Sequence, residues 1–249
     1  MRRYFFIVLL AVLSLDARAA DSTYERVLLP ITVFDIPGVN GSLWRSEAWV
    51  HLRESGVSIL PLRIADANPL PKGSNKLGVF LFRQGEPVGQ FIYVTRDLID
   101  TVHFNLRVRD MSRTSDTWGT EIPVVRESEF STESISLLPL PVESGFRSTL
   151  RVYGWGEGGG VVRVRVTVIA TNNSTDHAVH EQTYSLSHVA TQYGAPYLQL
   201  SIEDLVGDSA AETGLVRVDV EPVTEGLRVW AFASTTDNET QHFTTITPQ

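Results

Sequence analysis

The sequence contains no cysteine and only two lysines, Lys72 and Lys76. Without cysteine the chain can form neither a disulfide framework nor a thiolate metal site, and it cannot carry a lipid on cysteine. A net charge of −8 lacks the basic excess that neutralises phosphates, so we expect no nucleic-acid partner. With 43% hydrophobic residues the chain is too apolar to be disordered. These absences leave an acidic, folded protein.

A long hydrophobic run is also missing. The apolar stretch from Tyr4 to Leu15 is shorter than the roughly 20 residues that a spanning helix needs. Two arginines precede it and Ala17-Arg18-Ala19 follows it, which is the pattern of a signal peptide with an A-x-A cleavage site. We therefore expect residues 1–20 to be a signal peptide and the mature chain to have no membrane span. The protein would be exported, to the periplasm or the exterior.

The dominant pattern in the remaining chain is alternation of apolar and polar residues. From Val162 to Val168 every second residue is valine, and residues 216–221 alternate in the same way. This period predicts strands with one buried face, whereas helical patterns are confined to residues 96–100 and 203–206. The sequence predicts an all-β fold of antiparallel sandwiches. Further strands are expected at Leu28–Phe34, Trp44–Leu52, Val57–Arg63, Leu77–Phe82, Gly89–Val94, Phe104–Met111, Phe146–Tyr153, His180–Leu186 and Arg228–Ser234.

Landmarks recur in the same order in the two halves of the chain, which predicts two tandem Ig-like β-sandwich domains. The alternative is that all-β sequences resemble one another through shared alternation. The matched segments are Trp44–Ser46 with Phe146–Ser148, Asp97–Ile99 with Asp204–Val206, Leu106–Val108 with Leu227–Val229, Ser115–Asp116 with Thr236–Asn238, and Ile122–Pro123 with Ile246–Pro248.

The repeat sets the expected domain boundaries. Domain 1 would span residues 21–125 and domain 2 residues 139–249. Residues 126–138 are rich in serine and glutamate and are expected to form an acidic linker. The first copy is expected to lack a counterpart of the hairpin at Gly214–Pro222.

Four motifs carry a resemblance to known sequences: G-x-N-G-x-x-W-R-S at residues 38–46, W-G-T-x-I-P at 118–123, F-R-S at 146–148 and A-F-A-S-T-T-D-N-x-T at 231–240. The chain resembles an uncharacterised group of exported bacterial proteins from acidobacterial-type genomes, whose copies end in Ser-x-x-Asp-Asn-x-Thr. The resemblance implies tandem Ig-like β-sandwiches and export, and it implies no activity. The chain departs from the group in the turns that follow the two opening strands.

Residues 154–159 match the G-x-G-x-x-G pattern of dinucleotide-binding loops. That motif opens a helix whose N-terminus holds the pyrophosphate, but here a strand is expected at Val161–Val168. We therefore expect a hairpin loop.

Two short segments hold candidate metal ligands. His177 and His180 would share one face of a helix but point oppositely on a strand, where they would be ordinary solvated histidines. Asp237 and Asn238 lie in an oxygen-rich turn, which could hold calcium or could be an Asx-turn. Calcium is the possible cofactor.

Signatures of catalysis are scarce. The sequence has no G-x-S-x-G elbow and no H-E-x-x-H motif, and its paired glutamates lie in acidic loops that are expected to be solvated. A hydrolase would need His177, His180 or His188 to meet carboxylates in a cleft. We expect no catalytic residues.

Aromatic residues give the remaining candidate site. Trp49, Tyr153, Trp155 and Trp230 fall on the strand faces expected to be exposed, where aromatic rings can stack on sugars or anchor a protein. Alternatively, those faces pack between the domains. The sequence thus indicates a non-catalytic, exported protein that acts in binding or structural interaction at the bacterial cell envelope. Its partner would be an envelope protein or a polysaccharide, and a carbohydrate-binding module is the first alternative.

Overall fold

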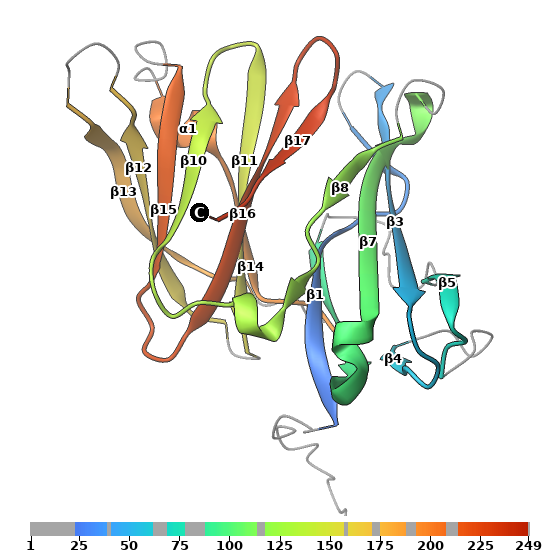
Figure 1. Cartoon of the computed structure of the whole chain (residues 1–249). Coiled ribbons are helices and arrows are strands. Elements are labelled where there is room, and N and C mark those ends of the chain that lie inside the picture. Colours follow the sequence, from blue (N-terminus) through green and yellow to red (C-terminus); the bar gives the residue numbers. More distant parts are fainter. Residues whose placement is uncertain are drawn as a thin grey trace, which may run out of the picture.

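The computed structural model describes residues 23–38, 41–61, 69–77, 88–113, 118–156, 159–170, 175–187, 193–207 and 214–248. The fold is all-β, as predicted, with four antiparallel sheets arranged as two sandwiches side by side (Figure 1). The expected signal peptide lies outside the described residues. The helical elements within the described residues are short: η3 (Arg96–Thr101), η4 (Met111–Arg113), η5 (Glu127–Glu129) and α1 (Ile202–Val206).

The first sandwich is formed by sheets A and B. Sheet A has the order β4 (Ile59–Leu60), β6 (Val88–Thr95), β1 (Tyr24–Thr32), β9 (Val125–Arg126). In sheet B, β2 (Ile36–Pro37) and β5 (Gly73–Lys76) both pair with β3 (Leu43–Leu52), which is followed by β7 (Val102–Asp110) and β8 (Thr120–Ile122).

The second sandwich is formed by sheets C and D. Sheet C has the order β14 (Tyr197–Ser201), β11 (Phe146–Trp155), β16 (Arg228–Asp237), β17 (Phe243–Ile246). Sheet D has the order β10 (Ile135–Pro141), β15 (Leu215–Pro222), β12 (Val161–Val168), β13 (His177–Ser185).

Alternation places the buried residues as the sequence predicts. On β3, Ala48, Val50 and Leu52 are buried against sheet A, while Trp49 and His51 between them are exposed. The valines of β12 and β15 fill the space between sheets C and D. Apolar burial is the main term that favours folding, so these two inner layers stabilise each sandwich.

The two sandwiches share one strand arrangement. In sheet B, β3 pairs with β5 and β7, and in sheet C, β11 pairs in the same way with β14 and β16. Trp44 lies opposite Asp110, and Phe146 lies opposite Asp237. Sheets A and D also correspond: β4, β6 and β1 are adjacent in sheet A in the same way as β12, β15 and β10 are in sheet D.

Several details of the expected repeat are wrong. By register, the counterpart of Leu106 is Ala233 and not Leu227, because Ala48 opposes Leu106 and Leu150 opposes Ala233. A Leu-Arg-Val triplet fits many places along an alternating strand, so it does not fix the register. The two acidic turns that were matched are not equivalent either. Asp97–Ile99 lies between β6 and β7, whereas Asp204–Val206 lies in α1, between β14 and β15. β6 takes the place that β15 has in the second sandwich, so the first copy does not lack that strand.

The strand order also differs from that of an immunoglobulin domain. There the first strand pairs with the second, whereas here β10 pairs with β15 and β11 belongs to the opposite sheet. Most connections therefore cross from one sheet to the other.

Sheet A is covered on both faces, because the outer face of sheet C packs against it. Tyr153 and Phe232, which are fully buried, join the core of the first sandwich, and the Tyr153 hydroxyl donates a hydrogen bond to the Pro30 carbonyl. Burial raises the pKa of this phenol. A Cβ atom at Gly89 would lie 2.4 Å from Tyr153 Cε1, so only glycine allows this close approach. The layers follow the order B, A, C, D.

Backbone hydrogen bonds also join the sandwiches. Phe91 N–H donates to the Tyr193 carbonyl at 2.7 Å and Ala195 N–H donates to the Gly89 carbonyl at 3.1 Å, so the segment before β14 extends sheet A. We call this contact between the two sandwiches the junction, and the expected linker at residues 126–138 is part of it. Within the linker, Ser131 exchanges two 2.8 Å hydrogen bonds with Val229 of β16.

Arg151 of β11 is buried at this junction without a carboxylate partner among the described residues. Its Nη1 donates to Ser234 Oγ at 2.8 Å, and its guanidinium lies over the Phe232 ring at 5.8 Å from the centroid. Burial lowers the pKa of Arg151, although Tyr153 opposes the shift. An unpaired buried charge has lost its hydration without a compensating ion pair.

We predict that Tyr153→Ala lowers the free energy of unfolding by about 3–5 kcal/mol, because it opens a cavity between sheets A and C. The wild-type protein should unfold in one cooperative transition, since its two sandwiches share a core, and the variant should show two. Urea denaturation followed by far-UV circular dichroism and tryptophan fluorescence tests this. Tyr153→Phe keeps the ring and should cost only about 1–3 kcal/mol, for the unsatisfied Pro30 carbonyl. Two separate transitions in the wild-type protein would contradict coupling of the two sandwiches through this core.

We predict that Arg151→Met raises the free energy of unfolding by about 1–4 kcal/mol, because a thioether of similar length needs no hydration. Arg147→Met is the matched control on the same strand. Arg147 is partly exposed and bonds Gln241 Oε1 at 3.0 Å, so its removal should bring no gain. Both variants are measured in the same urea titration. A loss of stability in Arg151→Met would show that the guanidinium is needed at the junction.

Candidate functional site

The structure separates the four predicted ligand-binding aromatics. Trp49 is 42% exposed, as expected, but Tyr153 is 0% and Trp230 is 4% exposed, and Trp155 is partly buried. The prediction that these last residues form an exposed platform is wrong, because sheet A covers the outer face of sheet C. Their rings belong to the junction, where Trp155 lies 5.4 Å from Phe91 by ring centroids. The alternative expectation, packing between the two halves, describes this arrangement.

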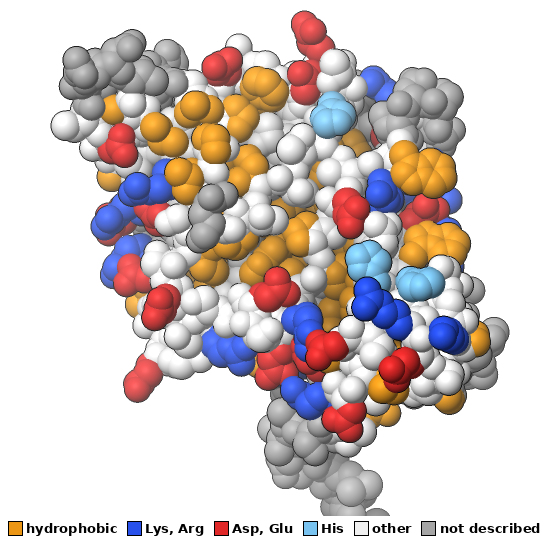
Figure 2. All heavy atoms as spheres, in the orientation of Figure 1, with side chains coloured by type: hydrophobic (Ala, Val, Ile, Leu, Met, Phe, Trp, Pro, Cys, Tyr) orange, Lys and Arg blue, Asp and Glu red, His pale blue; other side chains and the backbone are white. Residues whose placement is uncertain are grey.

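Trp49 lies on the outer face of sheet B, which none of the other three sheets of the described residues covers. Lys76 of β5 is opposite Trp49 and places its Nζ 5.4 Å from the centroid of the indole ring. The same Nζ bonds Glu47 Oε1 at 3.0 Å. At the right of Figure 2, hydrophobic, basic and histidine side chains gather over this part of the first sandwich.

A second exposed tryptophan completes the arrangement. Trp118, which is 74% exposed, precedes β8, and Arg109 Cζ lies 5.2 Å from its ring centroid. Arg109 Nη1 in turn donates to Glu47 Oε2 at 3.3 Å. Trp49, Lys76, Glu47, Arg109 and Trp118 therefore form a continuous row of contacts across sheet B, which we call the tryptophan row.

Sequence reasoning did not find Trp118 as a candidate site residue. It stands in a loop, where alternation gives no information about exposure. Its neighbour Gly119 has φ of +83°, and a Cβ there would lie 2.3 Å from Arg109 Cγ, so glycine allows Arg109 to pack against the backbone beside Trp118. The sequence alone does not reveal this contact.

Glu47 is the electrostatic centre of the row. Burial acts to raise its pKa, but the hydrogen bonds and charges of Lys76 and Arg109 outweigh burial and hold it below the ordinary value. Glu47 is therefore ionised at neutral pH and fixes both cations. Each cation lies beside one indole ring, so the carboxylate indirectly orients the two exposed aromatic surfaces.

The outer face around the row is polar and mostly self-paired. Arg107 Nη2 donates to Glu121 Oε2 at 3.3 Å. Arg45 forms a two-pronged pair with Asp35, with Nε and Nη2 donating at 2.8 and 2.7 Å. Such pairs at a surface contribute little to stability but fix side-chain directions. The face thus presents two indole rings within an ordered polar surround.

The histidines predicted as metal ligands lie on a strand and not on a helix. β13 contains His177 and His180, and His180 Nε2 lies 2.9 Å from the Tyr184 hydroxyl. Residue 188 lies outside the described residues. In the part of the chain that the structure describes, no group of three or more histidines and carboxylates is placed to hold a metal ion.

Asp237 forms the Asx-turn considered above as the alternative to calcium binding. Its Oδ1 accepts hydrogen bonds from the backbone of Glu239 at 2.9 Å and of Thr240 at 2.7 Å. The bonds from Thr240 are the main cause of the lowered pKa of Asp237. The Asn238 amide nitrogen donates to the Ser144 carbonyl at 2.8 Å. Asp110, opposite Trp44 in the first sandwich, makes the same kind of turn with Ser112 N at 3.0 Å.

The prediction of a hairpin loop for the glycine-rich segment is wrong, because the strands on either side of it do not pair: β11 belongs to sheet C and β12 to sheet D, so the segment crosses from one sheet to the other. β11 ends at Trp155 and β12 begins at Val161, so no helix follows to hold a pyrophosphate. Residues 157 and 158 lie outside the described residues.

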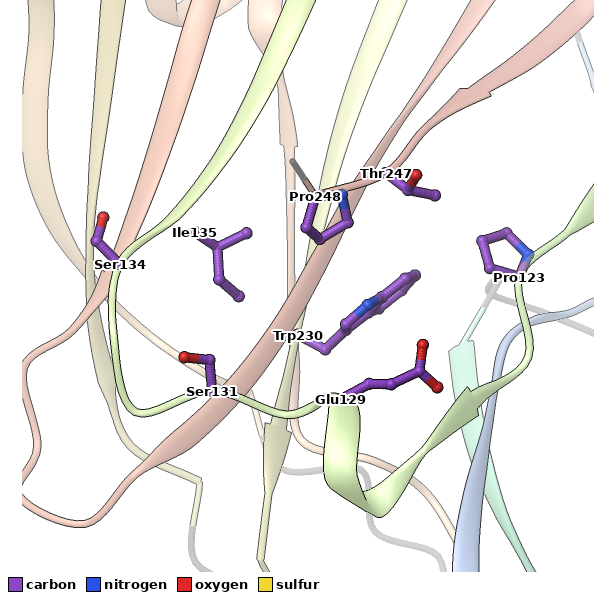
Figure 3. Close-up of a pocket in the computed structure, with 8 residues that line it drawn as sticks. All are labelled: Pro123, Glu129, Ser131, Ser134, Ile135, Trp230, Thr247 and Pro248. Atoms are coloured by element: carbon purple, nitrogen blue, oxygen red, sulfur yellow. The ribbon is translucent and has the colours of Figure 1, made fainter. Parts of the chain in front are cut away.

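A shallow hollow of about 480 Å³ lies where the linker and the C-terminal segment meet sheet C (Figure 3). Figure 3 shows the Trp230 ring at its centre, with Pro248 on one side and the Glu129 carboxylate on the other. Glu129 Oε2 accepts a hydrogen bond from Arg126 N, so it is occupied in shaping the linker. The hollow exposes little of the Trp230 ring, and we do not assign it as the main site.

Comparisons with protein-family models, with curated protein sequences and with solved structures found no match to this chain. Among the described residues, no helix has the length and apolar character that crossing a membrane requires.

We predict that Glu47→Gln lowers the free energy of unfolding by roughly 0.5–1 kcal/mol at pH 7, because two partly exposed ion pairs are lost. The folded-state pKa of Glu47 is lowered, so its contribution is complete above the ordinary value of 4.5 and is lost as the pH falls through the lowered pKa. The difference between variant and wild type should therefore vanish in acid. Urea titrations at several pH values measure it.

Glu121→Gln is the control, because Glu121 is 55% exposed and should contribute less. A difference between Glu47→Gln and wild type that persisted in acid would mean that the change acts through packing and not through charge.

Proposed function

We propose that the protein is a non-catalytic, exported binding protein of the bacterial cell envelope, and that its outer sheet B face binds a polysaccharide. The expected signal peptide at residues 1–20 and the resemblance to exported bacterial proteins support export. The absence of cysteine fits a chain that needs no oxidative folding in that compartment.

The tryptophan row is the observation that carries the proposal. Large rings are normally buried, yet Trp49 and Trp118 are 42% and 74% exposed on one side of sheet B. Each is held beside a cation, and both cations are bound to Glu47. A sugar ring has an apolar face and a polar rim, so it can stack on an indole ring while its hydroxyls bond neighbouring charged groups.

Two indole rings along one flat face suit an extended ligand better than a small one. A polysaccharide chain could cover both rings at once, and each contact would increase the effective concentration for the other. The cations beside the rings would favour a chain with acidic sugars on a protein whose overall charge is −8. The position on strands of a rigid sheet limits the conformational entropy lost on binding.

The test is a glycan-array screen of the protein, followed by titration with the polysaccharides that bind. Trp49→Ala and Trp118→Ala should each weaken binding about tenfold or more, as loss of an aromatic hot spot does. Running the screen with and without calcium also tests the expectation for Asp237 and Asn238, since a required ion there would make binding depend on calcium.

Val223→Ala is the matched control. Val223 is 46% exposed but lies in the second sandwich, away from the tryptophan row, so its removal should leave binding unchanged. Equal binding by Trp49→Ala, Trp118→Ala and wild type would exclude the row as the site. No binding to any polysaccharide by the folded protein would turn the search to envelope proteins.

A further inference from the structure

His51 and His103 face one another across sheet B. They form a directly opposed pair in the β3–β7 ladder, and both side chains are exposed. Directly opposed residues in antiparallel strands have Cβ atoms about 4.5–5.5 Å apart. Two imidazole rings attached at that spacing can reach a single ion, for which metal–nitrogen distances are about 2.0–2.1 Å.

The strand pairing fixes the positions of both histidines. The ladder runs without a bulge from Trp44 opposite Asp110 to Leu52 opposite Val102. Its inner face carries buried residues such as Val50 and Leu106, so the backbone under the pair cannot move freely. A site built on such strands is more precisely arranged than one built on loops.

Ser74 orients one of the two rings. It lies opposite His51 on β5, and its Oγ is 3.0 Å from His51 Nδ1. When Nδ1 donates its proton to this hydroxyl, the lone pair is on Nε2, at the outer edge of the ring. A hydrogen bond from the second ring nitrogen is the usual support of a metal-binding histidine.

Among the described histidines of the second sandwich, no two are directly opposed across neighbouring strands. His177 and His180 belong to one strand, β13, where a bulge between them places them opposite Val168 and Val166 of β12, so they follow one another along a strand and do not face each other across two strands. His180 is also engaged with Tyr184, both by the hydrogen bond and by ring stacking at 6.2 Å between centroids.

We propose that His51 and His103 form a two-histidine binding site for a divalent late first-row transition metal ion. Imidazole nitrogen suits copper, nickel and zinc, whereas calcium and magnesium prefer oxygen ligands. The general affinity order places Cu²⁺ above Ni²⁺ and Zn²⁺. Because the chain supplies two ligands, water fills the remaining positions, and the site is weaker than a structural site with four protein ligands.

The site lies beside Trp49, which provides a readout. Trp49 and His51 are on the same face of β3, two residues apart. Bound Cu²⁺ is paramagnetic and quenches nearby indole fluorescence, whereas Zn²⁺ does not. The proposal is independent of polysaccharide binding, because it concerns different side chains and a different ligand.

The experiment titrates the protein, produced without a histidine tag, with Cu²⁺, Zn²⁺ and Mg²⁺ by calorimetry and fluorescence. We expect one Cu²⁺ per chain, weaker Zn²⁺ binding, no Mg²⁺ binding and quenching by Cu²⁺ alone. His51→Ala and His103→Ala should each reduce Cu²⁺ affinity by about 100-fold, and Ser74→Ala by about tenfold. The Cu²⁺ affinity should fall as the pH is lowered, since an imidazole nitrogen must be unprotonated to bind a metal ion.

His177→Ala and His242→Ala are the controls, because both residues are exposed and lie elsewhere. They should bind Cu²⁺ as the wild type does. The melting temperatures of all variants without metal verify that they are folded, which exposed substitutions should allow. Unchanged Cu²⁺ affinity in His103→Ala, or a loss in His177→Ala instead, would overturn the proposal.

Discussion

The packing of the aromatic outer face of sheet C against sheet A is the contact on which the rest of the structure depends. Tyr153, Trp230 and Phe232 are buried there and join the core of the first sandwich, although they belong to the second. This packing turns two sandwiches into four successive layers. It also decides which aromatic residues remain available to a ligand, because it covers the large rings on the facing sides of sheets A and C. The outer face of sheet B is left to solvent, and there the tryptophan row and the histidine pair lie.

The inner layers of each sandwich could be predicted from the sequence, since alternation is a local property. The residues Ser46, Ala48, Val50 and Leu52 are buried as their spacing indicates. Strands without this pattern were missed. β5 has the sequence Gly-Ser-Asn-Lys, which buries no apolar side chain and pairs through its backbone. β10 contains two prolines, which argue against a strand, yet it lies at the edge of sheet D, where prolines are tolerated.

The candidate site could be predicted only in part, because exposure of an outer strand face depends on contacts distant in sequence. By register, Trp49 corresponds to Arg151 and His51 to Tyr153, so equivalent positions point the same way in the two copies. Trp49 and His51 are exposed on sheet B, whereas Arg151 and Tyr153 are buried on sheet C. No local pattern distinguishes them, since what differs is the presence of sheet A. Trp49 was identified from its strand, but Trp118 stands in a loop where periodicity carries no information.

The double coverage of sheet A has a consequence for how the chain is made. Synthesis proceeds from the N-terminus, and the strands of the first sandwich are complete before β11 and β16 exist. During that interval Leu28 and Phe91 face water on the side that sheet C later covers. A nascent first half therefore presents an exposed, aggregation-prone apolar surface, together with unpaired backbone groups at Gly89 and Phe91. A chaperone that shields this surface until the second half arrives would prevent the association of incomplete chains.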